Sequence, residues 1–471
     1  MASKESKTTR LLKEKLILET PRVWDKLTAK ERSAVFKYAE EYRAFLDRAR
    51  TERRAAAYFV KTATKQGFAE LGARKPRANG FYQLVRGKSL AMAVLGKRPM
   101  TDGIRLIASH TDCPRLDLKP NPLYEDTDLA LLKTHYYGGI KKYQWVARSL
   151  ALVGTVILAN GDQVDVEIGL APGDPILTIT DLLPHLGKKQ MEKKANEFIP
   201  AENLNLIVGE LPYSDKGADQ RVKLAIMELL NKKYKLTEED FTTAELQVVP
   251  AEQARDAGLD RRMIAAYGQD DRICAYTSFT ALMETKRPAH TAVAIFYDKE
   301  ETGSEGNTGA QSRFLEMFLM DLMIQSGIEP SFHNINRVLA NAKALSADVN
   351  AALDPTYPDV FEKRNACKLG SGVTMEKYSG HGGKYMTSDA NAEYAAWVRR
   401  LFNEHGIVWQ TGGQGKVDEG GGGTVAKFLA KMGMDVIDMG PPLLSMHSPL
   451  ELAAKDDLWM CHRAFAVFFA S

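Results

Sequence analysis

The spacing of apolar residues predicts a long helix near the N-terminus. Apolar side chains recur three or four positions apart between Val35 and Ala49, so they would share one face of a helix. Thr28 and Glu31 have the spacing of a capping box, in which side chains satisfy free backbone amides at the first turn. We therefore expect this helix to begin directly after Thr28.

A different pattern occupies residues 115–260. Val156–Leu158 and Val164–Ile168 alternate apolar and polar positions on either side of Asn160-Gly161, a dipeptide that is typical of a tight hairpin turn. The lysine-rich stretch 187–196 is polar throughout, which predicts an exposed loop. We therefore expect this middle region to be rich in β-strands.

Outside the middle region, short apolar runs alternate with helical patterns. Ile104–Ala108, Ala292–Tyr297 and Val436–Met439 are short and almost wholly apolar, as strands buried on both faces of a parallel sheet are. Residues 335–344 and 388–402 have helical spacing. Strands that alternate with helices indicate an α/β domain with a mainly parallel sheet.

Length and composition narrow the class of protein. The chain has 471 residues, enough for two or three domains, and its 44% hydrophobic and 26% charged residues are typical of a globular protein rather than a disordered or fibrous one. No stretch approaches the roughly 18 apolar residues of a membrane span, and the first ten residues lack the apolar core of a secretory signal. The net charge of +3 is too small to suggest a nucleic-acid binder. We expect a cytoplasmic protein with neither nucleic acid nor membrane as a partner.

The cysteines are few and dispersed. They are Cys113, Cys274, Cys367 and Cys461. No two of them form a CxxC pair, which argues against a disulfide scaffold and against a cysteine-based zinc site. Any metal site in this chain must therefore be built from histidine and carboxylate.

Five polar clusters follow strand-like runs or lie a few residues beyond them. They are Ser109–Asp112, Gly268–Arg272, Tyr297–Ser304, Ser346–Asp348 and Met446–Ser448. In an open α/β sheet, ligands collect beyond the carboxyl ends of the strands, so two histidines and several carboxylates could meet at one edge. Imidazole nitrogen and carboxylate oxygen suit zinc, and two ions about 3.5–4 Å apart can hold and acidify a water molecule.

The adjacent pair Glu300-Glu301 offers a base as well as a ligand. Consecutive residues at a strand end point in different directions, so one carboxylate could bind metal while the other faces the water. Taken singly, each cluster has a simpler explanation: an acidic pair is usually solvated surface, and Asp270-Asp271-Arg272 could begin a helix. Their conjunction beside strand-like segments favours a metal site.

The glycine-rich run at 419–424 raises the question of a phosphate-binding loop. It lacks the GxxxxGK[ST] spacing of a phosphate-binding loop. A tight turn that lets backbone approach a ligand is the better interpretation.

These motifs together closely resemble the aspartyl aminopeptidase family, and in particular its bacterial branch of cocatalytic metallo-aminopeptidases. The similarity covers nearly the whole chain and runs in order through SHTDCPRLDLKPNP, YYGG, DLLPHL, DDR, DKEETGS, SAD, GGGT and LLSMHS. The resemblance implies a catalytic α/β domain made of residues 1–112 and 263–471, with a mixed, mostly parallel sheet flanked by helices. It implies an inserted β-rich dimerisation domain at 113–262, and a homo-oligomer that is a tetrahedral dodecamer built from dimers.

The resemblance also implies a ligand set for two divalent metal ions in each subunit. His110 and Asp348 would hold one ion, Asp270 would bridge both, and Glu301 and His447 would hold the second. Zinc is the expected metal, with cobalt or manganese as alternatives.

Three further residues receive catalytic roles from the resemblance. Glu300 would be the general base, and Asp112 would orient the imidazole of His110. His185, in the DLLPHL segment, would stabilise the oxyanion at the active site of a neighbouring subunit.

The implied activity is removal of the N-terminal residue from peptides with a free amine, with a preference for acidic residues. Lys377 is the candidate cation for an acidic side chain. Lys299 stands where many relatives have a histidine that is not a ligand, and Asp354 stands where eukaryotic relatives have a histidine near the substrate. Two alternatives remain open at this point: a dinuclear metal deacylase or carboxypeptidase, and a catalytically silent assembly or shell protein.

Overall fold

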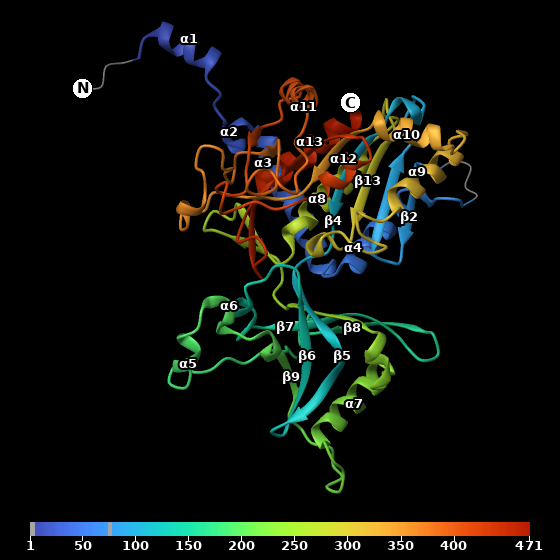
Figure 1. Cartoon of the computed structure of the whole chain (residues 1–471), viewed down its shortest axis with the longest axis vertical. Helices are drawn as coiled ribbons and strands as arrows, with labels where there is room; N and C mark the ends of the chain where they lie inside the picture. The colour runs from blue at the N-terminus through green and yellow to red at the C-terminus, as the bar shows by residue number, and fades with distance from the viewer. Residues whose placement is uncertain (1–4, 74–77) are drawn as a thin grey trace.

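A nine-stranded sheet forms the centre of the larger part of the molecule (Figure 1). The computed structural model describes residues 5–73 and 78–471. In spatial order the strands are β1 (Phe68–Glu70), β2 (Gly80–Val85), β3 (Ser89–Val94), β13 (Ala292–Tyr297), β4 (Arg105–His110), β14 (Lys343–Ala347), β18 (Asp435–Gly440), β16 (Val373–Glu376) and β17 (Trp409–Thr411). The four central strands β13, β4, β14 and β18 are parallel, as the short apolar runs predicted.

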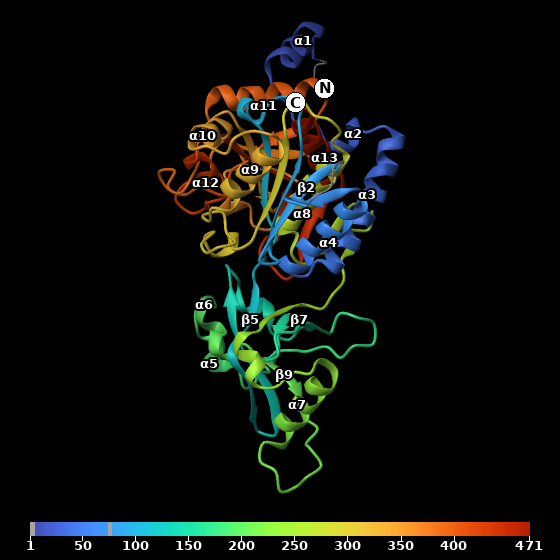
Figure 2. The ribbon, with the colours of Figure 1, turned by 90° about the vertical axis from the view of Figure 1, so that its right-hand side faces the viewer.

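Helices cover both faces of this sheet, as Figure 2 shows. One face packs on α3 (Ala29–Arg48), α4 (Glu52–Lys65), α8 (Gln269–Glu284), α11 (Ala392–Glu404) and α13 (Lys455–Ala470). The other face packs on α9 (Phe314–Gln325), α10 (Phe332–Ala340) and α12 (Ala426–Lys431). Along β13, Ala292, Ala294 and Phe296 join the first core, and the residues between them join the second. Successive side chains of a strand point to opposite faces, so a strand buried on both faces has to be apolar at every position.

The N-terminal helix begins where the sequence predicted. The hydroxyl of Thr28 accepts a hydrogen bond from the backbone amide of Glu31 at 3.3 Å, and the carboxylate of Glu31 accepts from the backbone amide of Thr28 at 2.9 Å. This is the complete capping box. The apolar face between Val35 and Leu46 is buried.

An antiparallel six-stranded sheet forms a second body with its own core (Figure 1). Its strands in spatial order are β8 (Gln163–Ile168), β7 (Leu150–Ile157), β10 (Glu245–Pro250), β5 (Arg115–Asp126), β6 (Leu129–Tyr137) and β9 (Asn205–Gly209). The predicted hairpin around Asn160-Gly161 is confirmed, with Ile157 paired to Gln163. The lysine-rich stretch 187–196 is mostly exposed, but it also holds the short helix α5 (Lys188–Met191) and the start of α6 (Ala195–Phe198).

A third, five-stranded sheet consists of β11 (Arg255–Ala257), β12 (Met263–Ala266), β20 (Glu451–Ala454), β19 (Pro442–Leu444) and β15 (Asn350–Ala351). The remaining helices are α1 (Lys7–Leu16), α2 (Val23–Lys26) and α7 (Arg221–Tyr234). Short 3₁₀ turns lie at Met100–Asp102, Lys142–Trp145, Ala201–Asn203, Glu239–Thr243, Glu300–Thr302 and Pro358–Val360. None of the helices within residues 5–73 and 78–471 is both long and apolar enough to cross a membrane.

Two predicted helix boundaries were wrong. The helix expected over 335–344 ends at Ala340, and β14 begins at Lys343. The small residues Ala342 and Ala344 fit either element, and pairing of this segment between β4 and β18 makes it a strand. The helix expected from residue 388 begins at Ala392 instead.

Candidate metal centre and active site

The acidic and histidine clusters meet at the carboxyl ends of the central parallel strands. His110 ends β4, Asp348 follows β14, and the Glu300-Glu301 pair lies in the 3₁₀ turn after β13. A cavity of about 390 Å³ lies among them. Its lining includes residues from all five polar clusters of the sequence: His110, Asp270, Glu300, Glu301, Asp348, Met446 and His447. The topology of the sheet thus brings together residues that are up to about 340 positions apart in sequence.

The two histidines are oriented in the same way. Nδ1 of His110 lies 3.0 Å from the carbonyl oxygen of Asp112, and Nδ1 of His447 lies 3.0 Å from the carbonyl oxygen of Gly139. A carbonyl can only accept, so each Nδ1 carries the proton and each Nε2 keeps its lone pair. Both Nε2 atoms are therefore free to bind a metal ion.

Asp270 lies between the two histidines and offers one oxygen to each. Nε2 of His110 is 3.4 Å from Oδ1 of Asp270, and Nε2 of His447 is 3.2 Å from Oδ2. On the first side, Asp348 lies 3.8 Å from His110, and on the second side Glu301 lies 3.3 Å from His447. The arrangement has two halves that share the Asp270 carboxylate.

The donors present fit zinc. Ligand atoms of His110, Asp270 and Glu301 all lie within 4.8 Å of one another, and imidazole nitrogen with carboxylate oxygen is a usual zinc ligand set. Oε1 of Glu301 is buried and has no hydrogen-bond partner among the described residues. A buried carboxylate oxygen without a donor is costly, and a bound cation would satisfy it.

Asp271 is a neighbour that the sequence did not single out. Its atoms form a second compact group with His110 and Asp348, and its Oδ2 accepts from the backbone amide of His110 at 3.4 Å. Two consecutive aspartates in the Gly268–Arg272 cluster look alike in the sequence. Only the fold distinguishes the one that faces both histidines.

The electrostatics of the site reflect crowded carboxylates. Burial raises the pKa of Glu300 to about 7, and burial together with the neighbouring charge of Asp270 holds the pKa of Glu301 well above its usual range. For Asp270, burial alone would raise the pKa, but the adjacent imidazoles of His110 and His447 outweigh it and lower the pKa. Carboxylates this close repel one another unless cations are nearby.

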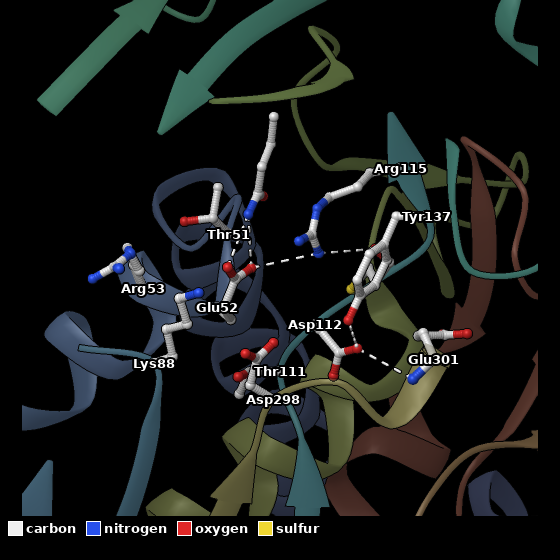
Figure 3. A network of polar contacts seen from close by, with 12 residues as sticks. Thr51, Glu52, Arg53, Lys88, Thr111, Asp112, Arg115, Tyr137, Asp298 and Glu301 are labelled. Atoms are coloured by element: carbon white, nitrogen blue, oxygen red, sulfur yellow. Dashed lines mark hydrogen bonds and ion pairs between the residues drawn. The ribbon is translucent and has the colours of Figure 1, made fainter. Parts of the chain in front are cut away.

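Asp112 lies beside His110, the residue that the resemblance implies it orients. Its Oδ1 is 3.3 Å from Nδ1 of that imidazole, and its carboxylate is fully buried. The same carboxylate accepts the backbone amides of Glu300 and Glu301, each at 3.2 Å, as Figure 3 shows for Glu301. Asp112 therefore holds both the histidine and the turn that carries the two glutamates.

His185 is not brought to this centre within one chain. It is exposed in the segment between β8 and β9, and it does not line the cavity. The glycine-rich run does reach the cavity through Gly421, Gly422 and Gly423. At Gly421, where φ is +110°, a Cβ atom would lie 1.7 Å from the carbonyl oxygen of Gly380, so the close approach there is to the chain's own backbone.

The cation in the cavity is not the one that the sequence suggested. Lys377 donates to Asp389 at 2.7 Å and lines a separate cavity of about 480 Å³. Lys427, in α12, lines the metal cavity instead and has no carboxylate within ion-pair distance in the described part of the chain. The carboxylate of Asp354 accepts from the backbone amide of Thr356 at 2.8 Å and does not line the metal cavity.

Comparison with known proteins decides the family. The model of the family described as aminopeptidase I zinc metalloprotease (M18) matches residues 45–469. The chain belongs to the M18 family. A curated relative from Borrelia garinii, named "Probable M18 family aminopeptidase 1", is 46% identical over 453 residues, which are 95% of this chain and 98% of that protein.

Solved structures of M18 aminopeptidases agree with the fold described above. The M18 aminopeptidase from Thermotoga maritima has a TM-score of 0.92 and 44% identity, and the match covers 96% of this chain and 99% of the other. Aminopeptidase I from Clostridium acetobutylicum has a TM-score of 0.90 and 43% identity over 97% and 100% of the two chains. As an M18 protein, the chain is an aminopeptidase and a metallopeptidase, and the expected α/β fold and family are confirmed.

Proposed function

We propose that this M18 chain is a dinuclear metal-dependent aminopeptidase that removes the N-terminal residue from peptides with a free amine. The observation that carries the proposal is the position of Asp270, whose two oxygens face the Nε2 atoms of His110 and His447 at 3.4 and 3.2 Å. One ion would be held by His110 and Asp348, the other by His447 and Glu301, and Asp270 would bridge them. Zinc is the proposed metal, and cobalt or manganese would fit the same donors.

Glu300 is the proposed general base. Two bound ions would acidify a water molecule and polarise the scissile carbonyl. Glu300 lines the same cavity, makes none of the close contacts with the two histidines, and has a pKa raised to about 7 by burial. A base with a pKa near the working pH takes a proton from water and returns it to the leaving amine efficiently.

We further propose that the enzyme prefers an acidic N-terminal residue, and that Lys427 is the residue that recognises it. Its ammonium lies 3.9 Å from the sulfur of Met386 at the cavity wall. An ammonium without a carboxylate partner attracts a negatively charged substrate group and repels a positively charged one. Lys377 and Lys384, by contrast, are both held by Asp389.

Assembly is the third part of the proposal. We propose that residues 113–262 form a dimerisation domain inserted between the two parts of the catalytic domain, and that dimers build a dodecamer in the cytoplasm. Large apolar side chains between Asp181 and Met191 are exposed; they are Leu182, Leu183, Leu186 and Met191. Such a stretch suits a surface that a second copy covers. The more distant mApe1 structure from Saccharomyces cerevisiae, which shares the fold, is described as a dodecamer.

His185 belongs to this exposed stretch, which explains how it could act without lining the cavity of its own chain. We propose that it reaches the active site of a neighbouring subunit and donates to the developing oxyanion there.

Removal of the metal tests the reaction class. Protein stripped with a strong chelator is expected to lose cleavage of a peptide with a free N-terminus and to regain it with zinc, cobalt or manganese. The same peptide with an acetylated N-terminus is expected to remain intact, because an aminopeptidase binds the free amine. Full activity in stripped protein would exclude a metal-dependent peptidase. Cleavage of the acetylated peptide at the acetyl group or at its C-terminus would favour a deacylase or a carboxypeptidase.

Replacement of Glu300 by glutamine tests the base. Glu300→Gln is expected to lower kcat by about 10²–10⁴-fold and to change KM little, because the amide keeps the shape but cannot take a proton. Glu305→Gln, an exposed carboxylate on the same loop, is the matched control and should retain wild-type kcat. A Glu300→Gln enzyme with more than a tenth of wild-type kcat would show that another group is the base.

Replacement of Lys427 by methionine tests recognition of the acidic residue. In Lys427→Met, the ratio of kcat/KM for an aspartyl substrate to that for a leucyl substrate is expected to fall about tenfold or more, as loss of a charge-assisted contact would cause. Lys431→Met, an exposed lysine one turn further along the same helix that does not line the cavity, should leave the ratio unchanged. Equal ratios in wild type and Lys427→Met would show that Lys427 does not recognise the acidic residue.

Complementation between chains tests whether His185 acts across subunits. His185→Ala and Glu300→Gln are each expected to be nearly inactive alone. When the two variants are co-expressed, a His185→Ala chain keeps Glu300 and can receive an intact His185 from a Glu300→Gln neighbour. With random mixing, about a quarter of the active sites should then be complete. A chain that carries both substitutions is the inactive control. Co-expressed protein no more active than its parents would show that His185 is not shared.

A further inference from the structure

The end of β6 and the turn after it reach the metal centre from the six-stranded sheet. We call this segment, Tyr137–Gly139, the β6 tip. The hydroxyl of Tyr137 donates to Oδ2 of Asp112 at 2.7 Å, and the carbonyl of Gly139 accepts from Nδ1 of His447 at 3.0 Å. The tip therefore touches both halves of the centre, although neither partner belongs to its own sheet.

The hydrogen bond from the Tyr137 hydroxyl is the shortest contact that the Asp112 carboxylate makes. Oδ1 faces the imidazole of His110 at 3.3 Å and the amide of Glu300 at 3.2 Å, and Oδ2 receives Tyr137 and the amide of Glu301. Without the phenol, Oδ2 would keep only the longer contact, at 3.2 Å. A fully buried carboxylate that loses a donor is destabilised, so it would move and take the histidine and the glutamate turn with it.

The phenol stays a donor in this environment. Burial first, and then the negative charge of Asp112, raise the pKa of Tyr137 above its ordinary value. The hydroxyl therefore remains protonated throughout the working pH range.

A charged group fixes the position of the Tyr137 ring (Figure 3). The guanidinium of Arg115 lies 3.9 Å from the ring centroid, a cation–π contact. Arg115 in turn donates to Asp117 at 2.8 Å and lies 3.6 Å from Glu52, which is in α4 under the nine-stranded sheet. Gln247, in β10, donates to Glu52 at 2.9 Å. The ring thus rests on a cation that is held by Asp117 of the six-stranded sheet and by Glu52 of helix α4.

Gly138 lets the tip approach the centre closely. Its φ is +72°, and a Cβ atom there would lie 3.3 Å from Cβ of Glu301 and 3.4 Å from Pro114. A side chain at this position would be strained and would press against a proposed metal ligand. The last three residues of the YYGG motif, Tyr137 to Gly139, are therefore explained by the contacts of the tip, which the local sequence pattern could not have shown.

We propose that the β6 tip completes the metal centre from the six-stranded sheet, with Tyr137 as a positioning residue for His110 and the glutamate turn and with Gly139 as the orienting partner of His447. This inference rests on the proposed function: its metal-affinity part depends on the proposed ligand set, and its kinetic part on the proposed peptidase reaction. Metal ligands are commonly oriented by such outer contacts, and loss of one typically costs about 10–100-fold in metal affinity or activity.

The test compares Tyr137→Phe with Tyr136→Phe. The first removes only the hydroxyl that meets Asp112, and the second removes the hydroxyl of a neighbour whose side chain is exposed. Zinc affinity is measured by competition with a chromophoric chelator, and kcat and KM are measured on one peptide substrate. For Tyr137→Phe we expect zinc affinity to fall about tenfold and kcat to fall about 10–100-fold, with KM nearly unchanged. Tyr136→Phe is expected to match wild type in all three.

The thermal midpoint of the metal-free protein separates positioning from simple loss of packing. The inference is supported if Tyr137→Phe keeps this midpoint but loses zinc affinity. It is overturned if zinc affinity and kcat stay at the wild-type level, or if they fall only in proportion to a lower midpoint. Gly138→Ala is a second test variant. It leaves the phenol in place, but its Cβ atom would press against Glu301, so zinc binding should also weaken. If the wild-type enzyme cleaves no peptide, the proposed function fails, yet the difference in zinc affinity between the two tyrosine variants still decides the role of the tip.

Discussion

Crowding of buried carboxylates is the constraint on which this molecule depends. Asp270, Glu301 and Asp348 lie together at the ends of the parallel strands, with Glu300 in the same cavity. Burial and mutual repulsion raise the pKa of Glu301 and of Asp348, and the two imidazoles outweigh burial only at Asp270. A protein gains nothing in stability from gathering such groups without cations. The arrangement is therefore best understood as a preformed site whose charge is balanced when metal binds.

Backbone groups and charged side chains around this site position the residues that face the cavity. Parallel strands deliver His110, Asp348 and the glutamate turn to one edge. Asp112 then joins one histidine to both glutamates through their backbone amides. The six-stranded sheet adds a phenol and a carbonyl at opposite sides. Contacts from the segment at the end of β6 therefore join those from the nine-stranded sheet around the site.

Much of the fold could be predicted from the sequence because its signals are local. The capping box of Thr28, the hairpin at Asn160-Gly161 and the apolar strand Ala292–Tyr297 each depend on a few neighbouring residues. The end of α10 could not be predicted, because the alternating residues 341–344 fit a helix or a strand until the neighbouring strands are known. Sheet order decides such cases.

Some residues of the candidate site could likewise be predicted from the sequence, and others could not. Residues carried by recognisable motifs, such as His110 and Glu300, lie in one cavity as expected. Tyr137 and Lys427 could not be assigned a role, because their proposed roles rest on contacts with segments distant in sequence. Asp271 is distinguished from Asp270 only by the direction in which each side chain points. His185 stays a prediction, since its proposed partner is another subunit.

The zinc content of the protein at saturation tests the central claim most directly. Stripped protein is dialysed against excess zinc, freed of loosely bound ions, and analysed for zinc per chain by elemental mass spectrometry, with Asp270→Ala beside the wild type. If Asp270 bridges two ions, the wild type should hold two zinc ions per chain and Asp270→Ala should hold fewer than one. A wild-type protein that saturates at one zinc ion per chain, or an Asp270→Ala protein that still holds two, would contradict the dinuclear account.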